Sequence, residues 1–151
     1  MSDDSFFGHA DPPPLAAGPF PVVVPPVPGL RELPGVWGTR EATSLKEVPR
    51  SLVVLGGGPA GLELAQALHR LGAEVALVDG SGHVLAREPA PLGEALAEAL
   101  RRDGIEIHVG VHAAAARREG DDFVLELEDG RELRGERLLV ATGRRPRVEG
   151  I

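Results

Sequence analysis

Residues 51–79, SLVVLGGGPAGLELAQALHRLGAEVALVD, predict a strand, a helix and a second strand in direct succession. Residues 51–55 form a short apolar run that glycines end at once, which is typical of a buried parallel strand. Residues 59–71 follow with a helical period, and residues 74–79 form the second apolar run. The 29 residues counted from Ser51 to Asp79 come close to the size of a β-α-β unit.

The helix predicted over residues 59–71 carries one apolar stripe, which we expect to face the core. The stripe consists of Ala60, Leu64, Ala67 and Leu71. Pro59 fits this helix because a proline is tolerated in the first turn, where its missing N–H group needs no partner. Gly72 predicts the C-terminal end of the helix.

A second helix and a third strand follow. The apolar spacing of the helix predicts one buried face, and Gly104 predicts its end. The residues expected on that face are Leu92, Ala95, Leu96, Ala99 and Leu100. Residues 106–109 predict the third strand.

The remaining residues change from a helical period to a period of two. Residues 123–127 alternate, Asp129–Gly130 predicts a two-residue hairpin turn, and residues 132–134 return. We expect residues 111–117 to pair with this hairpin, and residues 137–143 to form a last buried strand. The predicted fold class is therefore α/β: a Rossmann-like parallel sheet of β-α-β-α-β order with an inserted three-stranded antiparallel meander.

The N-terminal third of the chain is rich in proline. Ten of the 14 prolines lie within residues 1–50, which argues against a helix or a central strand there. We expect a disordered tail at residues 1–18, an extended connector at residues 19–50 and a dinucleotide-binding domain at residues 51–151. Trp37, the single tryptophan, is expected to pack the connector onto the domain.

Composition excludes several classes of function. The 16 basic and 23 acidic residues give a net charge of −7, which disfavours nucleic acid and anionic membranes as partners. The absence of cysteine excludes disulfides, thiolate metal sites and a thiol nucleophile within this sequence. The five histidines have no metal-ligand spacing, and no catalytic side-chain set can be assigned. No apolar run reaches a membrane span and the start lacks a signal-peptide core, so we expect a cytoplasmic location.

The glycine-rich segment at residues 56–61 predicts a dinucleotide site, since it follows a strand and opens a helix. Gly56 permits the tight turn, Gly58 leaves room for the pyrophosphate, and Gly61 lets the helix pack close to the strand. The helix N-terminus attracts the anion, and because Pro59 has no N–H group, Ala60 and Gly61 are the expected donors.

Asp79 ends the second strand 18 residues after Gly61, where an acidic residue hydrogen-bonds the adenosine ribose. The next residues, Gly80 to Gly82, offer no arginine for a 2′-phosphate, so NAD(H) is preferred over NADP(H). Arg87 could reach back from the following loop, which leaves NADP(H) open. The glycine pattern alone does not distinguish NAD from FAD.

Several segments together resemble the NAD-binding domain of the pyridine nucleotide-disulfide oxidoreductases. They are VVPPVPGL at 23–30, WGTREATSLKEVPRSLVVLGGGPAGLELAQ at 37–66, LGAEVALVD at 71–79, LRRDGIEI at 100–107 and DGRELRGERLLVATGRRP at 129–146. The resemblance implies that Glu63 lies near the nicotinamide carboxamide and that Gly143 passes close to the nicotinamide. An alternative role for Glu63 is helix stabilisation from the first turn. Pro59 stands where some relatives carry a gating tyrosine, which a proline cannot replace.

The segments that hold FAD, the redox cysteine pair and the dimerisation domain in that family have no counterpart here. The resemblance therefore implies an NAD(H)-binding module that presents NADH for hydride transfer to a flavin. FAD would be bound only if a missing half or a flavin-binding partner chain supplied its site. The alternatives are a stand-alone NAD(H)-binding module, an inactive truncated remnant, and a glycine loop that itself holds FAD.

Overall fold

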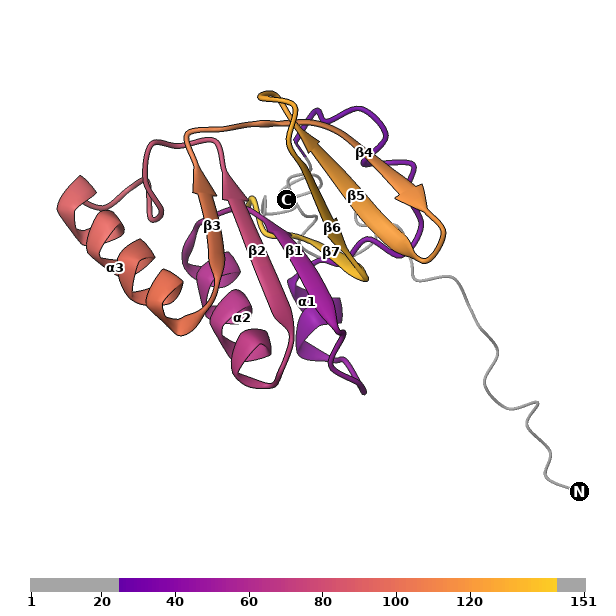
Figure 1. Cartoon of the computed structure of the whole chain (residues 1–151), viewed down its shortest axis with the longest axis horizontal. Coiled ribbons are helices and arrows are strands. Elements are labelled where there is room, and N and C mark those ends of the chain that lie inside the picture. The colour runs from indigo at the N-terminus through magenta and orange to yellow at the C-terminus, as the bar shows by residue number, and fades with distance from the viewer. Residues whose placement is uncertain (1–24, 144–151) are drawn as a thin grey trace, which may run out of the picture.

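The computed structural model describes residues 25–143, which form two sheets and three helices (Figure 1). Four parallel strands make the larger sheet in the order β3-β2-β1-β7. They are β1 (Ser51–Leu55), β2 (Glu74–Asp79), β3 (Glu106–Val109) and β7 (Arg137–Val140). The expected tail at residues 1–18 lies outside the described residues.

The three helices pack on one face of the parallel sheet. They are α1 (Thr39–Thr43), α2 (Pro59–Arg70) and α3 (Ala90–Asp103). Successive residues of a strand point to opposite faces. Leu52 and Val54 of β1 accordingly pack with the helices, while Val53 and Leu55 belong to a second core on the other face.

The second core lies between the parallel sheet and an antiparallel sheet of order β4-β5-β6. Its strands are β4 (Ala113–Glu119), β5 (Asp122–Leu127) and β6 (Glu132–Gly135). Figure 1 shows these strands crossing over β1 and β7 instead of continuing the parallel sheet. The predicted α/β class with an inserted meander is confirmed.

The turn between β5 and β6 is one residue longer than predicted. The Leu127 N–H group donates to the Arg131 carbonyl (2.8 Å), which leaves three residues in the loop. Gly130 has φ +84°, the left-handed conformation that such a three-residue loop requires.

The predicted core face of α2 is wrong in part. Its buried residues are Gly61, Leu62, Ala65 and Leu68. Of the expected stripe, Leu64 is half-buried and packs against the core, whereas Ala60, Ala67 and Leu71 are exposed, Leu71 to 65%. The reason is that Gly61 must face β1, because any Cβ there would collide with the Gly56 carbonyl oxygen. The contact fixes the rotation of the helix, so that Leu62, Ala65 and Leu68 are buried and the expected stripe lies at the margin of the core.

The predicted face of α3 is wrong in part for a similar reason. Its buried residues are Gly93, Ala97 and Leu100, and Leu92 is 53% exposed. A Cβ at Gly93 would collide with the Val84 carbonyl oxygen, so this glycine marks the line of closest approach. Of the predicted face, Leu100 is buried and Leu96 half-buried, whereas Ala95 and Ala99 are exposed.

The described part of the connector, residues 25–50, is not extended throughout as predicted. It carries the short helix α1, and Leu30 is fully buried in the core against the antiparallel sheet. Trp37 forms a parallel bridge with Leu139, with hydrogen bonds to Leu138 and from Val140 of 2.8 Å each. Proline excludes long helices, but α1 lies between Pro34 and Pro49, where no proline interrupts it. As expected, Trp37 packs this segment onto the sheet.

Candidate functional site

A cleft of about 920 Å³ opens at the carboxyl ends of β1, β2 and β7. Open α/β sheets bind their ligands at this edge. Six predicted site residues line the cleft: Gly56, Gly58, Pro59, Ala60, Asp79 and Gly143. Glu63 lines an adjoining groove, and Gly61 lines neither because it packs beneath the loop.

The three glycines of the loop have different geometric roles. Gly56 has φ +120°, and a Cβ there would lie 2.6 Å from the Ala141 carbonyl oxygen, so only glycine fits. Gly61 brings α2 against the Gly56 carbonyl. Gly58 has an ordinary φ of −77°, and a Cβ there would meet no atom of the described part of the chain within 4 Å. The space beside Gly58 is therefore open to a ligand.

The N-terminus of α2 lies at the cleft, which Gly58, Pro59 and Ala60 line. Gly58 is the N-cap, and no side chain of the described residues caps the helix. The first four N–H groups of a helix have no partner within it, and here they include those of Ala60 and Gly61. Together with the positive end of the helix dipole, they form an environment suited to a phosphate.

Asp79 is fixed by two backbone hydrogen bonds across the cleft floor. Gly57 N–H donates to its Oδ2 atom (2.6 Å), and Ser81 N–H donates to its Oδ1 atom (2.7 Å). Each carboxylate oxygen keeps a lone pair for one further donor, such as a ribose hydroxyl. A Cβ at Gly57 would lie 3.0 Å from Asp79, so this glycine permits the contact. This arrangement was not predicted from the sequence, although the unbroken run of three glycines at residues 56–58 was a signal for it.

Charged and polar side chains also line the cleft. Arg87 lies there, as the sequence left open, together with Glu88, Glu128 and His112. No sequence pattern predicted a role for these last three. In residues 25–143, no group of three or more His, Cys, Asp or Glu side chains is placed to hold a metal ion.

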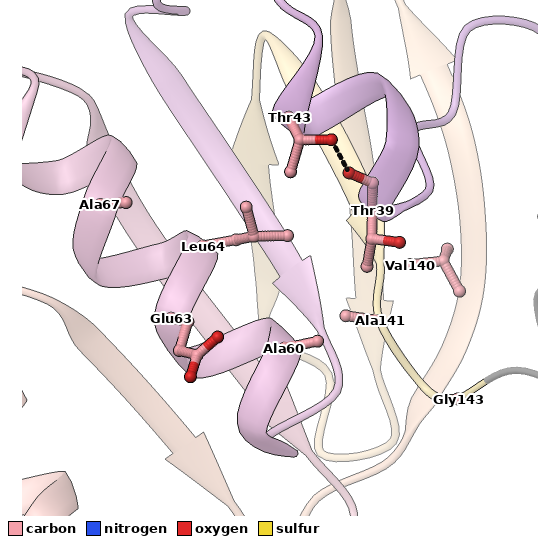
Figure 2. A pocket seen from close by; sticks show the side chains of 9 residues that line it. All are labelled: Thr39, Thr43, Ala60, Glu63, Leu64, Ala67, Val140, Ala141 and Gly143. Atoms are coloured by element: carbon pink, nitrogen blue, oxygen red, sulfur yellow. Dashed lines mark hydrogen bonds between the residues drawn. The ribbon is translucent and has the colours of Figure 1, made fainter.

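A second groove of about 600 Å³ adjoins the cleft between α1 and α2. In Figure 2, Thr39 and Thr43 of α1 lie across from Ala60 and Leu64 of α2, near Gly143. Thr43 Oγ1 donates to the Thr39 carbonyl (3.0 Å). Ala60, Leu64 and Ala67 of the expected α2 stripe thus form one wall of this groove.

Glu63 lies on the rim of the same groove as Gly143. It is the fifth residue of α2, and the first turn of that helix holds no acidic residue. The alternative of stabilisation from the first turn is therefore wrong, because the dipole effect falls off beyond that turn.

The sequence model of the pyridine nucleotide-disulphide oxidoreductases matches residues 15–151. The chain belongs to this family. Among its oxidoreductase relatives is the mercuric reductase of Acidithiobacillus ferrooxidans, which is 40% identical over 137 residues. The dihydrolipoyl dehydrogenase of Thermus scotoductus is 34% identical over 143 residues. Both alignments cover 91% of this chain, but only 24% and 30% of the respective relatives.

A solved structure of the family shows the same fold. The HOCl-induced flavoprotein disulfide reductase RclA from Escherichia coli matches with a TM-score of 0.76 and 31% identity. The match covers 85% of this chain and 29% of RclA. The chain therefore corresponds to about a quarter to a third of these pyridine nucleotide-disulphide oxidoreductases. In its described part, no helix is long and apolar enough to cross a membrane.

Proposed function

We propose that this chain binds NAD(H) in the cleft at the carboxyl ends of β1, β2 and β7. One observation carries the proposal: an open glycine backbone, a helix N-terminus and a fixed carboxylate border the same cleft. The pyrophosphate would lie beside Gly58 and accept hydrogen bonds from the N–H groups of Ala60 and Gly61. The adenosine ribose would donate to Asp79.

The nicotinamide would lie at the other end of the cleft, near Gly143. Gly143 and Ala60 border both the cleft and the groove, so a ligand there reaches Glu63. The Glu63 carboxylate would accept a hydrogen bond from the carboxamide N–H₂ group. NADH supplies a hydride when bound, and these residues would orient the ring that carries it.

The charges of the cleft favour NAD(H) over NADP(H). Asp79, Glu88 and Glu128 border it, against one arginine, Arg87. A 2′-phosphate next to Asp79 would place like charges together, which costs about 4 kcal/mol for unit charges 4 Å apart at an effective dielectric constant of 20. Arg87 would offset part of this cost, so we expect a preference of about tenfold, equivalent to about 1.4 kcal/mol.

The hydride acceptor would be a flavin held outside this cleft, by another segment of a longer protein or by a partner chain. The groove between α1 and α2 supports this part of the proposal. Its wall contains Leu64 and Ala67, and an apolar wall beside the nicotinamide end is suited to a covering domain. A module that works alone would leave this wall exposed to water.

A fluorescence titration with NADH, and NADPH as the comparison, tests the proposal. We expect saturable micromolar binding of NADH, about tenfold tighter than that of NADPH. A folded chain that binds neither dinucleotide would refute the proposal. Yellow colour that co-purifies and NADH-dependent bleaching would separate the flavin-coupled module from a stand-alone one. Tight FAD binding without NADH binding would assign the loop to the flavin instead.

A further inference from the structure

The loop after β3 lies against the loop after β2, at the edge of the cleft. The Gly110 N–H group donates to the Ser81 carbonyl (2.7 Å), which joins the two loops. The Glu128 N–H group donates to the His112 carbonyl (3.0 Å), which ties His112 to the turn between β5 and β6. The backbone of His112 is therefore held from two directions.

The imidazole of His112 packs directly on Gly80. A Cβ added at Gly80 would collide with the Nδ1 and Cε1 atoms of the ring. Residue 80 is therefore a glycine that makes room for a ring, one position after Asp79. His112 lines the cleft and is exposed, and within residues 25–143 its ring makes no hydrogen bond. Packing on Gly80 therefore holds the ring in place, while its nitrogen atoms make no hydrogen bond to any described side chain.

The strand order indicates which part of a bound dinucleotide would lie next to the His112 ring. Along β3-β2-β1-β7, Gly143 follows β7, the glycine loop follows β1 and Asp79 ends β2. A dinucleotide laid along this edge would place its nicotinamide by β7, its pyrophosphate by β1 and its ribose by β2. The adenine base would then lie beyond Asp79, toward the loop that follows β3 and contains His112.

We propose that the His112 ring packs against the adenine base and acts as a positioning residue for the adenosine half of the ligand. The inference rests on the proposed function. An aromatic side chain next to a nucleobase gains stacking contacts with little regard to the identity of the base. Gly80 belongs to the same arrangement because a Cβ at this position would collide with the ring.

Calorimetric titration with ADP-ribose tests the proposal, because this ligand lacks the nicotinamide. We expect His112→Ala to weaken ADP-ribose binding about tenfold, within the range of base-stacking contributions. His112→Phe keeps a flat ring and should bind within about twofold of the wild type, on the same stacking argument. His69→Ala is the matched control, since His69 lies at the end of α2 away from the cleft and should leave the affinity unchanged.

A double-mutant cycle supplies a second, independent readout. Gly80→Ala should weaken ADP-ribose binding by displacing the ring, and should have little further effect when His112 is already alanine. Equal affinities of wild type and His112→Ala would overturn the inference and leave the proposed function intact. A folded wild type that does not bind ADP-ribose would overturn the proposed function itself. Rescue by His112→Gln but not by His112→Phe would overturn stacking in favour of a hydrogen bond.

Discussion

Gly58 allows the proposed ligand contact to be tested separately from folding, because a Cβ there would meet no atom of residues 25–143 within 4 Å. Gly58→Ala adds a methyl group that meets no atom of residues 25–143 within 4 Å, on a backbone with φ −77° that alanine adopts freely. Lower entropy of the unfolded chain stabilises such a variant by about 0.4–1 kcal/mol. Alanine is the poorer N-cap by a similar amount. The free energy of unfolding should therefore change by less than about 1 kcal/mol.

The same methyl group should obstruct a pyrophosphate. Gly58 lines the cleft, so the added Cβ would occupy space that the phosphate oxygens need to reach the N–H groups of Ala60 and Gly61. Loss of one hydrogen bond to a charged group costs about 1.5–3 kcal/mol. We expect NADH to bind at least about tenfold more weakly, which corresponds to 1.4 kcal/mol. Fluorescence titration gives the affinity, and urea denaturation gives the free energy of unfolding.

Gly61→Ala is the matched contrast, since it places the same methyl group three residues further along. There the Cβ collides with the Gly56 carbonyl oxygen and lies 3.3 Å from the Ala141 Cβ atom. Overpacking of this kind costs about 1–3 kcal/mol, so this variant should lose stability. A Gly58→Ala variant that binds NADH as tightly as the wild type would refute the placement of the pyrophosphate beside this backbone.

Three further predictions concern the cleft, the connector and the antiparallel sheet. Asp79→Asn should weaken NADH binding and reduce the preference for NADH over NADPH in paired titrations; an unchanged ratio would contradict the ribose contact. Leu30→Ala should lower the free energy of unfolding by about 2–5 kcal/mol in urea denaturation, because Leu30 is fully buried. No change would place residues 25–50 outside the folding unit. Hydrogen bonds from Arg134, and then from Arg117, hold the pKa of the Glu119 carboxyl below its ordinary value of 4.5. Its small contribution to stability is therefore complete above that pH and lost as the pH falls through the lowered pKa. In Glu119→Gln, the free energy of unfolding should depend less on pH in this acidic range, as measured by denaturation at a series of pH values. The same pH dependence in the variant and the wild type would exclude the contribution.

The elements and their order follow from local sequence patterns, but the rotation of the helices does not. In α2, both Leu62 and Leu64 belong to apolar stripes with helical spacing, so periodicity alone could not choose between them. The choice depends on Gly61, which must face the Gly56 carbonyl. That carbonyl belongs to the loop before the helix, and its position is a property of the folded chain.

The backbone geometry of the glycine loop could be predicted from the sequence in part. Glycine spacing reports on φ angles and on close approach, and the structure has a positive φ at Gly56 and a close backbone contact at Gly61. The binding roles of the loop residues stay predictions. The clamp between Gly57 and Asp79 joins positions 22 residues apart. The position of His112 depends on the pairing of a loop with another sheet. Neither contact has a local pattern, because both arise from long-range packing.

The bridge between Trp37 and Leu139 determines where a stable fragment of this chain can begin. Strand β7 is the last of the described strands in its sheet, and Trp37 pairs with the side that β1 leaves free. A sheet edge with unsatisfied N–H and C=O groups is a template for pairing between molecules. A fragment that started at Ser51 would keep every residue of the glycine loop but uncover this edge. We expect such a fragment to self-associate. A monomeric fragment should therefore include the residues before β1 that contain Trp37.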